Sequence, residues 1–209
     1  MKIKKQQYLL PKEIITQDSI TSWFDANYDS LSKAEHTYLA QPQLKAALKS
    51  ILRYAEKHRE KWEAVIEAEV NVSLVKEDYI IDGKIDLIKS PEAGDSRNMV
   101  EIIDFKSEKK PDLAREAEKI DRYKKQLQVY AYLVEQNTGK KVNKLHLYYT
   151  GEEDGVPTIS FDPLKTEIKE TIADFDRTVR KIQNRNFEHK SKSGKVCENC
   201  DFRFYCKRG

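Results

Sequence analysis

The chain has 209 residues and a mass of 24.4 kDa, which suits one main α/β domain and a small appendage, since domains most often contain about 100 to 150 residues. The apolar share of 39% excludes wholesale disorder, while the charged share of 35% and the mean hydropathy of -0.76 exclude a membrane-spanning segment. The formal net charge is only +3, so any surface for a polyanion must come from local basic patches. No secretory signal follows the basic start, and we expect a cytoplasmic protein with no membrane partner.

The first part of the chain predicts two helices followed by a strand. A short helix is expected from Asp18, which can cap its first turn. Residues 41–62 carry apolar side chains at intervals of three and four, the spacing of an amphipathic helix. Residues 66–74 then alternate between apolar and polar side chains, which predicts a half-buried strand.

The middle of the chain predicts further strands joined by short polar connections. Extended structure is expected at residues 79–81 and again at 85–88, with Gly83 breaking the run between them. A polar loop over residues 90–98 then leads into the apolar run 99–105. This run is the best candidate for the central strand of a sheet.

The last part of the chain predicts two more helices around two strands. Apolar periodicity over residues 113–136 indicates a long helix, and residues 145–149 and 156–161 indicate strands. Asp162 is expected to cap a final helix with Pro163 at its first position. The complete order of elements indicates an α/β fold in which a central mixed β-sheet is flanked by helices.

An acid and an amine stand together at the end of the predicted central strand. Asp104 and Lys106 are two residues apart and project to one face, whereas Ile103 and Phe105 project to the other and can pack under a helix. Asp86, in the preceding strand, is expected to come close to Asp104. Two carboxylates and a main-chain carbonyl suit Mg²⁺, and a neighbouring lysine can position or activate a water for attack on a phosphodiester. The alternative is an ordinary surface ion pair.

Polar side chains of neighbouring elements extend this set. Glu69 lies on the polar face of the strand predicted at 66–74. On the helix that follows the central strand, Gln126 and Tyr130 are four residues apart and Tyr123 precedes Gln126 by three. That spacing places the last three side chains on one face of the helix.

Together these motifs resemble the nuclease domains of the PD-(D/E)xK superfamily, and specifically its RecB-like branch, found in UvrD-type helicases and in AddB-like proteins. The resemblance covers about residues 62–206. It is carried by Gly-x-x-Asp at 83–86, Asp-x-Lys at 104–106 and Gln-x-x-x-Tyr at 126–130, in that order. It implies a restriction-endonuclease-like core and a DNA nuclease that depends on Mg²⁺ or Mn²⁺.

The resemblance also implies roles for individual residues. Asp86 and Asp104 correspond to metal ligands, and the carbonyl of Ile103 completes the shell. Lys106 corresponds to the catalytic lysine of the family, and Glu69 resembles its upstream acid.

A second set of roles concerns DNA. Gln126 and Tyr130, with Tyr123 on the same helix face, correspond to the DNA-facing helix motif of the family. His36 is the candidate for the additional histidine ligand that the family places ahead of the sheet.

All three cysteines lie in the last thirteen residues, as Cys197, Cys200 and Cys206. Their spacing resembles the last three ligands of an iron–sulfur staple whose fourth cysteine precedes the nuclease core. That fourth cysteine is absent from this sequence, so we expect a 4Fe–4S cluster only in a longer, full-length protein. Zinc held by the three cysteines with His189 or water, and three free thiols, are the alternatives.

The sequence as a whole predicts a metal-dependent deoxyribonuclease that acts on single-stranded or unwound DNA in repair or recombination. We divide the chain into an N-terminal helical segment (1–61), a nuclease core (62–187) and a basic cysteine-containing tail (188–209). No Gly-x-x-x-x-Gly-Lys-Ser/Thr motif is present, so helicase domains are expected in cis or in trans. A non-catalytic DNA-binding or strand-guiding module of a helicase and a purely structural interaction domain are the alternatives.

Overall fold

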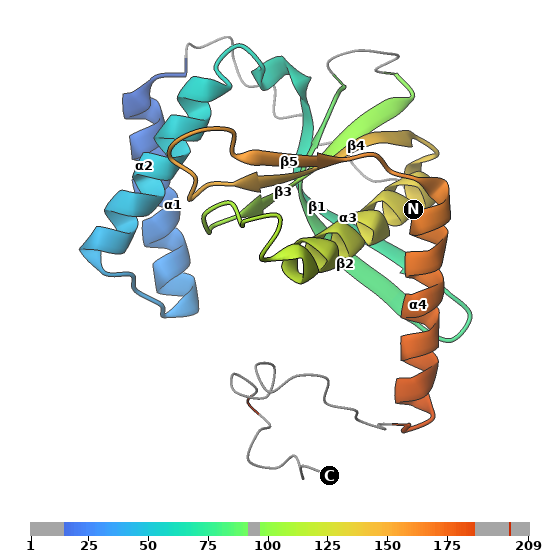
Figure 1. Ribbon diagram of the computed structural model, residues 1–209. Coiled ribbons are helices and arrows are strands. Elements are labelled where there is room, and N and C mark those ends of the chain that lie inside the picture. Colours follow the sequence, from blue (N-terminus) through green and yellow to red (C-terminus); the bar gives the residue numbers. More distant parts are fainter. Residues whose placement is uncertain (1–14, 92–96, 187–200, 202–209) are drawn as a thin grey trace. The chain divides into compact units, whose positions relative to one another are not determined.

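A computed structural model describes residues 15–91, 97–186 and 201. Within these residues one sheet has the strand order β1-β2-β3-β4-β5, and only β3 and β4 pair in parallel. The strands are β1 (Val65–Val75), β2 (Ile80–Lys89), β3 (Met99–Lys106), β4 (Lys141–Tyr149) and β5 (Thr158–Phe161). The parallel crossover contains helix α3 (Ala117–Thr138), which crosses one face of the sheet (Figure 1). The predicted mixed sheet is confirmed.

Two helices precede the sheet and lie side by side (Figure 1). The first, α1 (Gln17–Glu35), is longer than predicted and is capped by Thr16 rather than by Asp18. The Thr16 hydroxyl accepts a hydrogen bond from the Ser19 main-chain N at 3.1 Å, and the Ser19 hydroxyl accepts one from the Thr16 N at 2.9 Å. This reciprocal pair is a capping box that places the helix cap two residues before the predicted one. The second, α2 (Gln41–Lys57), ends before the predicted limit.

Strand β2 runs without interruption through Gly83, so the predicted break is wrong. Gly83 pairs with Val72 of β1 inside the ladder. A β-carbon at Gly83 would lie 2.9 Å from Cε1 of Tyr130 on α3, closer than two carbon atoms can approach. The glycine therefore makes room for an aromatic ring against the strand instead of turning the chain.

Strand β3 presents its side chains to two different layers. Phe105 packs edge-on against Tyr54 of α2, with ring centroids 5.2 Å apart. Lys106 points to the opposite face, where its Nζ donates a hydrogen bond to Oε1 of Gln126 on α3 at 3.1 Å. The alternation seen in the sequence is thus confirmed, with α2 covering one face of β3 and α3 the other.

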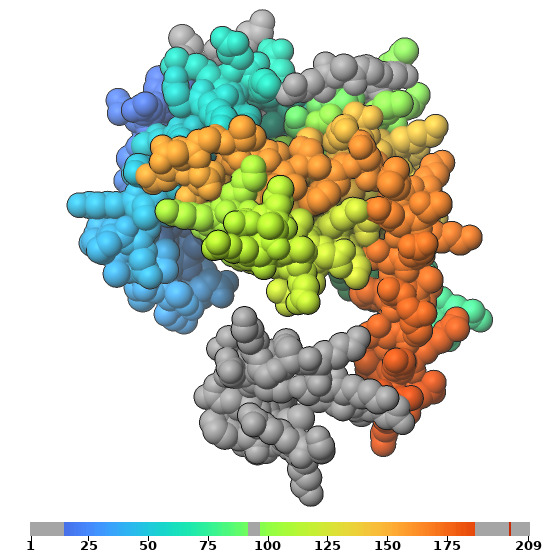
Figure 2. Space-filling view, viewed as in Figure 1, coloured from blue at the N-terminus to red at the C-terminus, as the bar shows by residue number. Residues whose placement is uncertain are grey.

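Helix α3 begins at Ala117, four residues after the predicted start. Oδ1 of Asp112 accepts hydrogen bonds from the main-chain N atoms of Ala114 (2.8 Å) and Arg115 (3.2 Å). This local side-chain turn competes with helical hydrogen bonding and leaves Leu113 60% exposed. The segment between β3 and α3 is therefore a loop, and its atoms lie against those of the β4–β5 connection (Figure 2).

Contacts along the chain group residues 1–163 and 164–209 into two compact units. The division at residues 61 and 187 made from the sequence stays a prediction. No helix in the described part of the chain is long and apolar enough to cross a bilayer. The predicted cluster or zinc residues lie outside the described residues: Cys197, Cys200, Cys206 and His189.

The second unit contains helix α4 (Lys165–Gln183), whose N-cap is Leu164. Neither Asp162 nor Pro163 starts the helix, contrary to the prediction. Asp162 instead forms an ion pair with Lys144 of β4, with Oδ1 and Nζ 2.5 Å apart. Its side chain is therefore engaged within the first unit.

Candidate active site

The candidate site lies where β2 and β3 separate. Their ladder stops at the pair formed by Leu87 and Ile103. Beyond that pair, Oδ2 of Asp86 accepts a hydrogen bond from the main-chain N of Phe105 at 2.6 Å. Phe105 is the middle residue of the Asp-x-Lys motif, so this bond ties the Gly-x-x-Asp motif directly to it. The two motifs that the sequence marked are brought together.

Asp104 is a buried carboxylate, and one of its oxygens accepts no hydrogen bond from the described residues. The residue is only 4% exposed, and its Oδ2 lies 2.6 Å from Nζ of Lys106. That ion pair does not have the directions of a hydrogen bond, and Oδ2 accepts none from the described residues. Burial raises the pKa of the Asp104 carboxyl, against the opposing attraction of Lys106, and the charge of Asp86 raises it further. The pair is therefore no ordinary surface ion pair.

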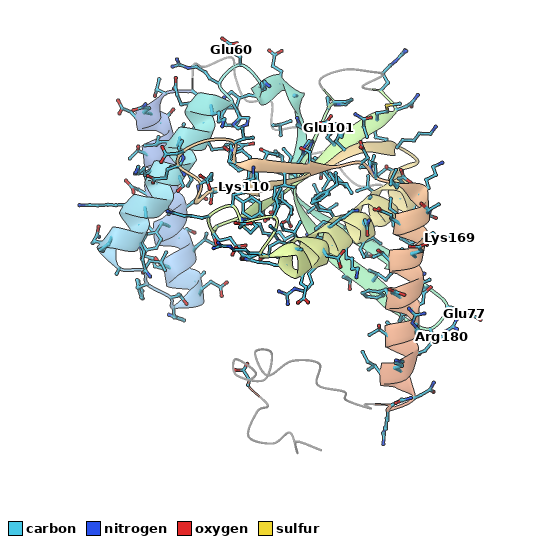
Figure 3. The ribbon with its side chains drawn as sticks, viewed as in Figure 1. Glu60, Glu77, Glu101, Lys110, Lys169 and Arg180 are labelled. Carbon is cyan, nitrogen blue, oxygen red and sulfur yellow. The ribbon has the colours of Figure 1, made fainter. Side chains whose placement is uncertain are left out.

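Glu101, the other buried carboxylate of β3, provides a contrast (Figure 3). Its Oε2 lies 2.9 Å from Nζ of Lys89 and 3.2 Å from Nε2 of His146. Burial acts to raise the pKa of Glu101, but Lys89 and His146 outweigh it and hold the pKa below its usual range. Two basic side chains thus contact the Glu101 oxygen, whereas Oδ2 of Asp104 has an ion-pair contact with Lys106 but no hydrogen bond from the described residues.

Lys106 is held on three sides. Its Nζ contacts Asp104, donates to Oε1 of Gln126 at 3.1 Å and lies 4.0 Å from the ring centroid of Tyr123. Nε2 of Gln126 in turn donates to the hydroxyl of Tyr130 at 2.9 Å. These two bonds fix which end of the Gln126 amide faces the lysine. Two side chains of the predicted helix face, Gln126 and Tyr123, therefore contact Lys106. The contact of this face with DNA stays a prediction.

Glu69 lies level with Asp86 in the β1–β2 ladder, between the pairs Ala68–Leu87 and Val70–Ile85, but its carboxylate is engaged by another residue. The Glu69 carboxylate forms an ion pair with Lys84 of β2, and His36 ends α1. Among the described residues, no three or more His, Cys, Asp or Glu side chains gather in a geometry that could hold a metal ion. Asp86 and Asp104 are the acidic side chains of this site that could donate oxygens to a hard divalent cation, and Oδ2 of Asp104 accepts no hydrogen bond from the described residues.

Comparison with known proteins decides the family. The sequence profile of the PD-(D/E)XK nuclease superfamily matches residues 3–207. The chain belongs to this superfamily. A search of curated proteins finds no match.

A solved structure supports the fold of this PD-(D/E)XK domain. A crystal structure described as a "putative exonuclease" from Eubacterium rectale is similar with a TM-score of 0.56 and 18% identity, covering 90% of this chain and 71% of that chain. The crystal structure of SSO0001 gives a TM-score of 0.45 at 18% identity, covering 89% of this chain and 79% of that one. The restriction-endonuclease-like core predicted from the sequence is confirmed.

Two residues of the PD-(D/E)XK domain that sequence analysis missed border Lys106. Tyr149 neighbours Lys106 in the β3–β4 ladder and is wholly buried, and its hydroxyl has no hydrogen-bond partner among the described residues. Burial, with a contribution from the Glu108 carboxylate, raises the pKa of Tyr149 to about 12. Glu108 continues the alternation of Asp104 and Lys106, a signal that could have marked it, whereas nothing in the sequence marked Tyr149.

The unpartnered hydroxyl makes Tyr149→Phe a sensitive probe of the site. Because no hydrogen bond is lost, the free energy of unfolding should stay equal to that of the parent or rise by about 1 kcal/mol. Tyr130→Phe is the control, since it loses the bond from Gln126 and should be destabilised by about 1 kcal/mol. Urea denaturation measures both. A loss of more than about 1 kcal/mol in Tyr149→Phe would show that the hydroxyl has a partner, such as a buried water.

Proposed function

We propose that this PD-(D/E)XK domain is a metal-dependent deoxyribonuclease whose site is formed by Asp86, Asp104 and Lys106. The observation that carries the proposal is their convergence. Asp86 is bonded to the main chain of the Asp-x-Lys motif, and the two charged residues of that motif are 2.6 Å apart and almost buried.

Asp86 and Asp104 would hold Mg²⁺ or Mn²⁺, together with the main-chain carbonyl of Ile103. A divalent ion bound there supplies charge stabilisation to the scissile phosphate and lowers the pKa of a water. The support for these ligands is chemical. Hard cations take carboxylate and carbonyl oxygens, and Oδ2 of Asp104 is a buried acceptor without a hydrogen bond.

Lys106 would supply a fixed positive charge beside the reacting phosphate. Its ammonium has three donors, and one of them is committed to Gln126. Another side of the ammonium faces Oδ2 of Asp104 at 2.6 Å, and the remaining donor can orient a water for in-line attack or stabilise a phosphate oxygen as charge develops. Because its side chain is only 14% exposed, the ammonium acts where competition from bulk solvent is weak.

The substrate we propose is single-stranded or unwound DNA, bound through its backbone. Helix α3 carries Arg122, Lys124 and Lys125 next to Gln126, and such cations bind phosphates with little dependence on sequence. The order of the Gly-x-x-Asp, Asp-x-Lys and Gln-x-x-x-Tyr motifs supports the RecB-like branch. We therefore propose helicase domains in cis or in trans as partners and a role in DNA repair or recombination.

The cysteine tail enters this proposal only as part of a longer assembly. The whole chain has three cysteines, and a 4Fe–4S cluster takes four thiolates. A cluster would need a fourth thiolate from outside this chain. Iron, zinc and sulfide analysis of the purified chain tests this, and a full 4Fe–4S content in the monomer would contradict it.

The direct test is cleavage of end-labelled substrates by the purified chain. With Mg²⁺ or Mn²⁺ we expect cleavage of single-stranded DNA, and with EDTA we expect none. Duplex DNA and RNA of the same sequence are the comparison substrates. Cleavage of RNA alone would contradict the proposed substrate. Salt-sensitive DNA binding without cleavage under any metal would contradict the nuclease and support a strand-guiding module.

A further inference from the structure

A second layer of side chains lies behind Lys106, on the loop after β3 and the first turns of α3. The hydroxyl of Tyr123, whose ring lies 4.0 Å from the Lys106 ammonium, donates to Oε1 of Glu108 at 3.1 Å. The other oxygen of Glu108, Oε2, lies 2.5 Å from Nζ of Lys119. A continuous chain of contacts therefore runs from Lys119 through Glu108 and Tyr123 to Lys106.

Each member of this chain is held from a different element. Glu108 is fixed by its main chain, because its carbonyl accepts a hydrogen bond from the N of Gly151 at 3.2 Å. A β-carbon at Gly151 would lie 2.6 Å from the carbonyl carbon of Glu108, so the β4–β5 connection presses directly on this residue. Lys119 lowers the pKa of the Glu108 carboxyl, which keeps it charged and a strong acceptor for Tyr123.

These contacts therefore fix both the position and the orientation of the Tyr123 ring. Its hydroxyl end is tied to Glu108, and one ring face is covered by the Lys106 ammonium. A cation is attracted to the face of a tyrosine ring at this distance. The covered face is not open to a nucleic-acid base, so the ring supports the lysine rather than the substrate on that side.

We propose that Glu108 and Tyr123 are positioning residues that hold Lys106 in place for phosphodiester hydrolysis. This inference rests on the proposed function, in which Lys106 acts on the scissile phosphate. Asp104 and Gln126 contact the Lys106 ammonium directly, and the face of the Tyr123 ring covers it as a third contact. Glu108 acts through its bond to Tyr123, and its charge also attracts the Lys106 ammonium directly.

Kinetics of single and double variants test the chain of contacts. Tyr123→Phe keeps the ring but loses the hydroxyl, and Glu108→Ala loses the acceptor, so each should lower kcat about tenfold with KM unchanged. The double variant should be no worse than Glu108→Ala alone, because that variant has already lost the bond to the Tyr123 hydroxyl. Glu108→Gln retains an acceptor oxygen and should recover most of kcat. Glu116→Ala, which removes another partner of Lys119 (3.4 Å), should leave kcat at the parental value.

A structural measurement separates positioning from activity. In the metal-free protein labelled with ¹³C-lysine, the Hε signal of Lys106, identified by its loss in Lys106→Arg, should be displaced by the Tyr123 ring current. The displacement should disappear in Tyr123→Leu and shrink in Glu108→Ala, but persist in Glu116→Ala. Metal-free DNA binding should be equal in the parent and in Tyr123→Phe.

The possible outcomes separate the positioning role of Glu108 and Tyr123 from the proposed nuclease activity. An unchanged Lys106 signal in Glu108→Ala, or additive kcat losses in the double variant, would overturn the positioning role even where the parent cleaves DNA. Weakened DNA binding by Tyr123→Phe at unchanged kcat would make Tyr123 a substrate contact and overturn it too. A parent that never cleaves, but shows the displaced signal, would contradict the nuclease alone.

Discussion

Asp104→Asn is expected to abolish DNA cleavage without weakening the fold. Asparagine has the same shape but no charge, so it cannot replace a carboxylate as a ligand of a hard divalent cation. We expect cleavage to fall by about 10³-fold or more, the scale on which removal of a group that stabilises the transition state acts. The initial rate of cleavage of labelled single-stranded DNA, measured with the parent and the variant at saturating Mg²⁺, gives the ratio.

The free energy of unfolding should not fall in the same variant. The pKa of the Asp104 carboxyl is raised in the folded state because burial disfavours its charged form. A raised carboxyl pKa contributes stability below the ordinary pKa that is lost as the pH rises through the raised one, so at pH 7 the carboxylate opposes folding. Asp104→Asn removes that opposition but also takes a close counter-charge from Lys106, so we expect a urea midpoint close to that of the parent.

Two controls give this result its meaning. Asp29→Asn removes an exposed carboxylate of α1 that pairs with Lys33 at 2.6 Å, and it should leave both cleavage and stability unchanged. Lys106→Met removes the charge next to Asp104 and should reduce cleavage by a similar factor. Parental cleavage by Asp104→Asn, with its folding verified, would remove the chemical basis of the proposed site.

The sequence predicted the architecture correctly where apolar and polar side chains repeat at one regular spacing. The alternation of Asp104 and Lys106 with Phe105 holds because a strand between two helical layers must place apolar side chains where they can pack and charged ones at a site. The predicted start of α3 failed because Asp112 forms a local turn that no periodicity reveals. The predicted cap at Asp18 was wrong for a similar reason, since the hydroxyls of Thr16 and Ser19 form a capping box that starts the helix earlier.

The candidate site was predictable only in part. The convergence of Asp86 with Asp104 followed from spacing, because adjacent strands bring such residues together. The environment of Lys106 did not, since the buried hydroxyl of Tyr149 and the contact of Glu108 with Tyr123 depend on the parallel crossover and on the β4–β5 connection. Long-range packing of this kind leaves no periodic signal in the chain.

Gly83→Ala is expected to disturb both stability and cleavage, because Gly83 is a packing residue for α3. The new β-carbon would lie 2.9 Å from Cε1 and 3.3 Å from Cδ1 of Tyr130, a ring that is 9% exposed. Either the ring or the strand must shift, which costs about 1–3 kcal/mol of unfolding free energy. Displacement of the ring would also loosen the bond from Gln126 to Tyr130, and Gln126 holds Lys106. Urea denaturation and the cleavage rate measure the two effects.

A double variant identifies the cause. In Tyr130→Leu the aromatic edge that meets the new methyl group is gone, so Gly83→Ala should cost less in that background than in the parent, with a coupling of about 1 kcal/mol or more. Gly139→Ala is the matched glycine control. Its φ of +71° makes alanine strained, but a β-carbon there meets nothing within 4 Å, so its cost should be independent of Tyr130. If Gly83→Ala lowered the free energy of unfolding equally in both backgrounds, the glycine would be required by the backbone of β2 and not by the Tyr130 ring. The Gly-x-x-Asp motif would then act through β2 alone, without any link from its glycine to Gln126 and Lys106.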